Sequence, residues 1–98
     1  MNPSRRPLIA GNWKMFLDAA QAVGLAREVA RRVSRFRHCD VVVCPGHPLL
    51  GVVAKVLDGT SKSLGAQDVS DEVEGAFTGD SSARMLLSVG CRYVIIGH

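Results

Sequence analysis

Long apolar runs are missing from this sequence. No stretch approaches the ~20 consecutive apolar residues of a membrane-spanning helix, although 47% of the 98 residues are hydrophobic. Arg5 and Arg6 precede only a short apolar stretch at residues 8–10, which is too short for the apolar region of a secretory signal. We therefore expect a globular cytoplasmic protein with no membrane partner.

Cysteine is scarce, and its arrangement does not indicate a disulfide framework. The three cysteines are an odd number and form no C-x-x-C pair, which favours a reducing compartment. Cys39, Cys44 and His47 match no zinc-ligand spacing, and Cys44 falls in an apolar segment. We expect buried free thiols and no metal site.

Aromatic residues make up only 5% of the chain, and a single one, Phe36, lies between the arginines of residues 27–37. The net charge of +3 is therefore better explained by a solvated helix face than by a nucleic-acid interface, and no nucleic-acid partner is expected. The phosphate-binding fingerprint G-x-G-x-x-G does not follow the first apolar segment, which argues against a dinucleotide-binding fold.

The segment at residues 7–15 is the most informative part of the chain. A continuous apolar run at residues 8–11 is typical of a buried parallel strand, and Asn12 and Lys14 follow at its carboxyl end. Ligands of α/β proteins bind at that end. A lysine there either meets an anionic ligand or is an ordinary surface lysine.

Strand-like and helix-like patterns then alternate, which predicts one α/β domain with parallel strands. The longest helix is expected at residues 18–35, with Asp18 as N-cap and an apolar face that includes Leu25 and Phe36. A short helix capped by Asp80 or Ser81 ends at Gly90. Buried strands are expected at residues 8–11, 40–44, 63–67 and 92–98, and a further helix at 48–58.

The carboxyl ends of these strands meet at one edge, where they present Asn12, Lys14, Cys44, Gln67 and His98. A cation, amides and an imidazole suit a small phosphorylated or carboxylated substrate. Lys14 would stabilise negative charge, and His98 would exchange a proton with a substrate oxygen. A structural role for His98 stays open at this point. The carboxylate expected nearest to this edge is that of Asp68.

A loop at residues 69–79 carries an apolar side chain, Phe77, between Gly75 and Gly79. An exposed phenylalanine at such a tip either folds back on its own domain or inserts into a partner.

Five motifs occur in order between Pro7 and His98 and together resemble the triosephosphate isomerase family. They are Gly-Asn-Trp-Lys-Met at 11–15, Val-Cys-Pro at 43–45, Gly-Ala-Gln-Asp at 65–68, Gly-Ala-Phe-Thr-Gly at 75–79 and Gly-Cys-Arg-Tyr-Val-Ile-Ile-Gly-His at 90–98. The resemblance implies a (β/α)8 TIM barrel of about 250 residues, of which residues 1–98 would be the N-terminal half, ending with the fourth strand.

The resemblance also implies an activity: cofactor-free interconversion of dihydroxyacetone phosphate and D-glyceraldehyde 3-phosphate through an enediolate. By matching position, Lys14 and His98 are the catalytic lysine and histidine. Asn12 and Trp13 belong to the same substrate-binding turn, in which Trp13 is expected mainly to pack. Phe77 and Thr78 match the loop that enters the neighbouring subunit of the family's homodimer.

The family's glutamate base, mobile lid and late phosphate-binding loops have no counterpart in these 98 residues. We therefore expect the chain alone to be inactive and marginally folded or self-associated, with open strand edges. An alternative is a non-catalytic half-barrel module that binds phosphate or oligomerises.

Overall fold

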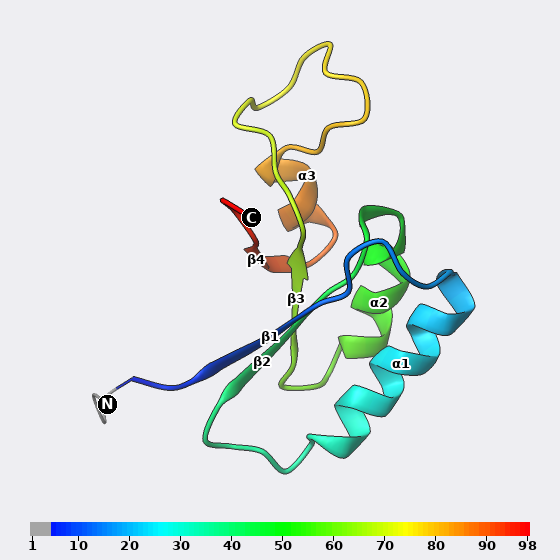
Figure 1. Cartoon of the computed structure of the whole chain (residues 1–98), viewed down its shortest axis with the longest axis vertical. Coiled ribbons are helices and arrows are strands. Elements are labelled where there is room, and N and C mark those ends of the chain that lie inside the picture. The colour runs from blue at the N-terminus through cyan, green and yellow to red at the C-terminus, as the bar shows by residue number, and fades with distance from the viewer. Residues whose placement is uncertain (1–4) are drawn as a thin grey trace.

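A computed structural model describes residues 5–98. Its centre is a parallel sheet in which the strands follow the order β1-β2-β3-β4, so that each strand lies beside the next in the sequence (Figure 1). This order confirms the expected α/β architecture with sequential parallel strands. The strands are β1 (Leu8–Asn12), β2 (Asp40–Cys44), β3 (Ser63–Ala66) and β4 (Cys91–Val94).

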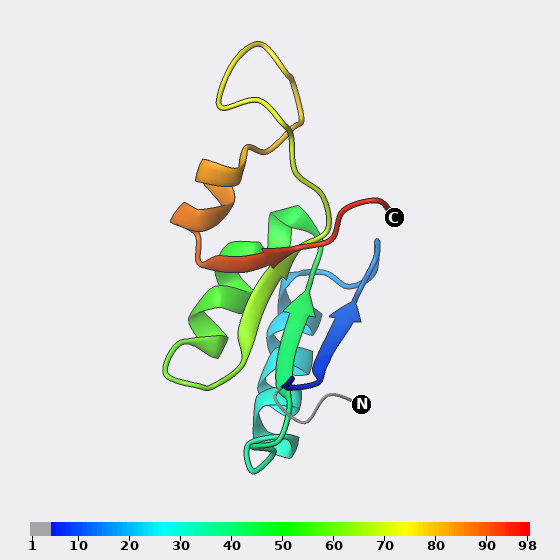
Figure 2. The ribbon, with the colours of Figure 1, turned by 90° about the vertical axis from the view of Figure 1, so that its left-hand side faces the viewer.

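The helices all cover the same face of this sheet. When the molecule is turned to show the strands, the helices lie behind and to one side of them, and the opposite face has no helix over it (Figure 2). The connections are α1 (Ala19–Arg32), a 3₁₀ turn η1 (His47–Leu49), α2 (Leu50–Leu57) and α3 (Ala83–Ser88). Within residues 5–98, no helix combines the length and apolar character needed to cross a membrane.

The core lies between the helices and the sheet. Ala22 and Ala26 of α1 are fully buried, and Val53 of α2 is fully buried against them. Small residues on α1 let the two helices approach closely, while β-branched valines fill β2. The sheet side of this core includes Val43 and Leu64.

The apolar pattern of the first helix extends further than the helix itself. The helix ends at Arg32, and Val33 is its C-cap, three residues before Phe36. Phe36 is 48% exposed and Leu25 is 40% exposed, so the expectation that both lie on a buried face is wrong. The chain leaves α1 in a turn before Phe36 can reach the core.

The start of α3 also differs from the expectation. Its N-cap is Ser82, whose Oγ accepts a hydrogen bond from Met85 N at 3.1 Å, and not Asp80 or Ser81. Ser81 is used elsewhere, because its backbone oxygen accepts from Ser70 N at 2.8 Å and its hydroxyl lies 3.2 Å from His47 Nδ1. Gly90 follows the helix with φ = 104°, as expected of a helix-ending glycine.

The first and fourth strands were expected to be buried, and both are largely exposed. Leu8 and Ile9 of β1 are 49% and 57% exposed, and Tyr93 of β4 is 40% exposed. Both are edge strands of the sheet, so each has only one neighbouring strand. The fourth strand is also shorter than the expected residues 92–98, because it ends at Val94. One further backbone hydrogen bond follows it, from Ile95 N to Ala66 O at 2.9 Å.

Candidate active site at the carboxyl ends of the strands

The ends of β1, β2 and β3 are joined by one side chain, the amide of Gln67. Its Nε2 donates to the backbone oxygen of Lys14 at 2.9 Å and to that of Cys44 at 2.8 Å. Cys44 O also accepts from Trp13 N at 3.0 Å. The segment that carries Lys14 is therefore fixed to the neighbouring strand ends by two hydrogen bonds, and the third joins those two strand ends to each other.

Lys14 has an unusual backbone conformation for a residue with a side chain. Its φ is +53°, in the left-handed region, which costs about 1–2 kcal/mol for a residue with a Cβ. Asn12 Oδ1 accepts from Lys14 N at 3.0 Å, and Gln67 holds the carbonyl on the other side. Backbone strain held in place by such bonds is typical of functional sites.

The ammonium group of Lys14 is available to a ligand. The residue is exposed and forms no ion pair within residues 5–98. It lines a cavity of about 330 Å³ together with Gln67, Asp68 and Ser81. Asp68, the carboxylate expected nearest to this edge, therefore shares a cavity with the lysine.

The structure does not join His98 to this cluster. His98 is exposed, four residues beyond the end of β4, and no hydrogen bond in the described part of the chain involves its ring. The C-terminus and the end of β1 both lie on the right in Figure 2, with the C-terminus higher, and Figure 1 separates them sideways. Asn12, Lys14 and Gln67 thus form one bonded group, and His98 lies apart on the same side of the sheet.

Trp13 lies in the same turn but faces the core. Its ring packs against the helix-side cluster and lines an apolar cavity of about 500 Å³ beside Ile9 and Val41. Gln67 was expected only as one polar group at the edge, and its role in fixing Lys14 was missed. The sequence shows only that an amide side chain follows the third strand. It does not show which backbone carbonyls that amide bonds to.

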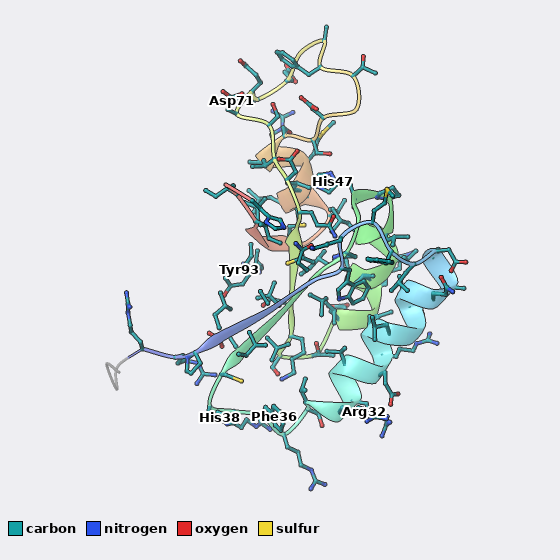
Figure 3. All side chains as sticks on the ribbon, in the orientation of Figure 1. Arg32, Phe36, His38, His47, Asp71 and Tyr93 are labelled. Atoms are coloured by element: carbon teal, nitrogen blue, oxygen red, sulfur yellow. The ribbon has the colours of Figure 1, made fainter. Side chains whose placement is uncertain are left out.

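The loop at residues 69–79 projects away from the sheet above α3 (Figure 1). Phe77 is 47% exposed and turns back over Gly75, where an added Cβ would lie 2.6 Å from Phe77 Cε2. Val73 in the same loop is 67% exposed. The loop thus presents apolar surface, and its base is held by the hydrogen bond from Ser70 N to Ser81 O and by the bond between His47 Nδ1 and Ser81 Oγ. Figure 3 labels His47 near this base and Asp71 in the loop.

All three cysteines are free and buried, as expected. Burial raises the pKa of the Cys44 thiol, and burial together with the nearby Cys44 raises the pKa of Cys91. These thiols are therefore protonated and poorly nucleophilic at neutral pH. The described residues contain no group of three or more side chains suited to hold a metal ion.

A sheet of sequential parallel strands with helices on one face, and polar groups at the strands' carboxyl ends, defines a segment of a TIM-barrel protein. The structure superimposes with a TM-score of 0.89 on the crystal structure of triosephosphate isomerase from Bartonella henselae, at 38% identity, covering 96% of this chain and 38% of that one. The family model for triosephosphate isomerase matches residues 7–98. The chain belongs to the triosephosphate isomerase family.

Relatives in other bacteria agree with this assignment. The triosephosphate isomerase of Herpetosiphon aurantiacus is 46% identical over 94 residues, and that of Citrifermentans bemidjiense is 49% identical over 94 residues. Each alignment covers 96% of this chain and 38% of the relative. The chain thus corresponds to the N-terminal portion of the family and spans a little over a third of the relatives' length.

Proposed function

We propose that this chain supplies the lysine-bearing half of a triosephosphate isomerase active site, which interconverts dihydroxyacetone phosphate and D-glyceraldehyde 3-phosphate. The observation that carries the proposal is the strained, bonded position of Lys14 between Asn12 and Gln67. This position leaves a cation free at the edge where TIM barrels bind substrates.

The proposed chemistry is proton transfer next to a carbonyl group. Abstraction of a carbon-bound proton leaves an enediolate, whose negative charge the Lys14 ammonium stabilises. His98 donates a proton to one enediolate oxygen and accepts one from the other, so that the carbonyl moves between adjacent carbons. The base that abstracts the carbon-bound proton and the loops that hold the phosphate come from outside residues 1–98.

We also propose that Phe77 and Thr78 form a dimer contact in the assembled enzyme. Phe77 and Val73 expose apolar surface at the projecting loop, which is costly unless another surface covers it. We expect this loop to contact the surface beside Lys14, at the carboxyl ends of the strands, in a second copy of the same fold. Phe77→Asp is expected to dissociate the dimer, as measured by sedimentation velocity.

The catalytic proposal is tested in a chimera in which residues 1–98 replace the matching segment of the Herpetosiphon aurantiacus relative. We expect isomerase activity on glyceraldehyde 3-phosphate. Lys14→Met should lower kcat by about 10²–10³-fold, the effect of removing one group that stabilises developing charge. His98→Gln should lower kcat by about 10²-fold or more.

Matched variants control for the loss of charge and of a ring. Lys55→Met removes an exposed lysine of α2, and His38→Gln removes an exposed histidine before β2. Both should leave kcat unchanged. A folded chimera without activity, or full activity in Lys14→Met, would refute the catalytic proposal and favour a phosphate-binding or oligomerising module.

A further inference from the structure

A second polar cavity lies at the opposite end of the sheet from Lys14. It measures about 760 Å³, and its polar lining comes from the turn between α2 and β3 and from the start of β4. In Figure 1 that turn lies at the lower end of the sheet, away from the loop that carries Lys14. The polar lining residues are Asp58, Thr60, Ser61, Lys62, Ser63 and Arg92.

Lys62 is the unusual member of this set. It is only 7% exposed, yet among residues 5–98 its ammonium makes a single hydrogen bond, from Nζ to Ser61 Oγ at 3.0 Å. No carboxylate pairs with it among residues 5–98. A buried cation without a counter-charge is costly, because it loses hydration and gains no ion pair.

Capping of a helix end does not account for Lys62. A lysine near the carboxyl end of α2 would be explained if it bonded to the last carbonyls of the helix. Lys62 makes no such bond within residues 5–98: Leu57 O accepts from Thr60 N at 2.9 Å and from Thr60 Oγ1 at 2.7 Å, Ala54 O accepts from Asp58 N at 3.0 Å, and Lys62 Nζ bonds to Ser61 Oγ. Lys62 therefore has donors left over.

The second cation of the cavity is Arg92. It is exposed, and it forms no ion pair within the described part of the chain. In the sheet, Leu64 pairs with Cys91, the residue before Arg92. Lys62 lies two residues before Leu64 in the chain. Against these two positive charges stands one carboxylate, that of Asp58, so the lining of the cavity keeps a net positive charge.

We propose that this cavity is an oxyanion site that binds a phosphate group, either free phosphate or the phosphate of a small phosphorylated molecule. The Lys62 ammonium supplies a positive charge from a largely buried side chain that lines the cavity, and the Arg92 guanidinium supplies paired donors that match phosphate oxygens. The hydroxyls of Ser61 and Ser63 add neutral donors. The site is separate from the edge that carries Lys14 and does not depend on the isomerase proposal.

The test is a titration of the ¹⁵N-labelled 98-residue chain and of the chimera with inorganic phosphate, followed by NMR. We expect saturable shifts of amides in residues 58–64 and 90–93. Glycerol 2-phosphate in a parallel titration distinguishes a site for free phosphate from one that also accepts a phosphate ester. Sodium chloride at matched ionic strength should not reproduce the shifts.

Two variants remove the charges one at a time. Lys62→Met and Arg92→Gln should each weaken phosphate binding by about tenfold or more, the effect of losing a charged hydrogen bond. Because Arg92 is exposed, its replacement leaves the fold intact even if the Lys62 variant does not fold. Lys55→Met, on the exposed face of α2, should bind phosphate as the parent does.

Isomerase kinetics of the chimera separate the two anion sites. Inhibition by phosphate at the catalytic edge should be unchanged in Lys62→Met and Arg92→Gln. Equal phosphate affinity in the parent and in both variants would overturn the proposal, as would shifts that sodium chloride reproduces or that are confined to residues around Lys14.

Discussion

Gln67 is the side chain that ties the Lys14 turn to the sheet. Gln67→Met keeps the side-chain volume but removes both Nε2 donors, so the backbone oxygen of Lys14 loses its partner. In the chimera we expect a stability loss of roughly 1–2 kcal/mol in urea unfolding and a kcat about tenfold lower. In a Lys14→Met background the same change should hardly alter kcat. Equal kcat losses in both backgrounds would show that Gln67 does not act through Lys14.

Gly65 of β3 lies close to side chains of β2, with no room for a side chain of its own. A Cβ there would lie 2.7 Å from Cys44 Sγ and 3.0 Å from Val42 Cγ1, and both of those side chains are almost fully buried. Gly65→Ala should therefore destabilise the fold by about 1–3 kcal/mol, measured by urea unfolding. The control is Gly24→Ala in α1, where the added methyl meets nothing within 4 Å and should stabilise by about 0.5–1 kcal/mol. The opposite order of stability would contradict the close approach of β2 and β3.

Asn12 and Lys14 were predictable as candidate site residues from their position after an apolar run, and the structure places both in one bonded turn. The role of Gln67 in fixing this turn was not predictable, because the amide meets carbonyls 23 and 53 residues away in the chain. Long-range contacts of this kind leave no local pattern.

Helix α1 begins with a complete capping box. Asp18 accepts from Gln21 N at 2.9 Å, and Gln21 Oε1 accepts from Asp18 N at 3.0 Å. Asp18→Ala should lower the free energy of unfolding by about 1 kcal/mol, whereas Asp18→Asn should cost much less, because asparagine is also a good N-cap. Asp71→Ala, in the exposed loop, controls for the loss of a carboxylate. Thermal unfolding distinguishes the three variants, and equal effects of Asp18→Ala and Asp71→Ala would refute the capping role.

The last turn of α1 carries a small charge network. Hydrogen bonds from Arg32 and Arg31 lower the pKa of Glu28. Since the lowered pKa belongs to the folded state, the contribution of Glu28 to stability is present above its unfolded pKa and is lost as the pH falls through the lowered pKa of the folded state. Glu28→Gln should therefore be less stable than the parent at pH 7 and equal to it at low pH. High salt should shrink the difference, because these side chains are exposed.

Element types were predictable from the sequence, but several boundaries were not. Asp18 was identified as an N-cap because an acidic residue directly precedes a helical apolar pattern. The cap of α3 was misplaced because Asp80, Ser81 and Ser82 are all suitable cap residues, and the contacts of Ser81 with Ser70 and His47 decide among them. Periodicity likewise could not show that the chain turns at Val33.

Within residues 5–98, the sheet has two open edges and one face without helices. Apolar side chains at these places are exposed, among them Ile9 and Tyr93 on the edge strands and Ile96 at 76%. Their apolar composition predicted burial, because composition does not reveal whether a strand has neighbours on both sides. Exposed strand edges pair readily with other chains.

Complementation is the most direct test of this account. The 98-residue chain and a polypeptide with the remaining sequence of the Herpetosiphon aurantiacus relative are assayed separately and together for isomerase activity on glyceraldehyde 3-phosphate. We expect no activity from either part, activity from the mixture, and none when the chain carries Lys14→Met. Activity of the 98-residue chain alone would contradict the account, and so would an inactive mixture that circular dichroism and sedimentation show to be folded and assembled.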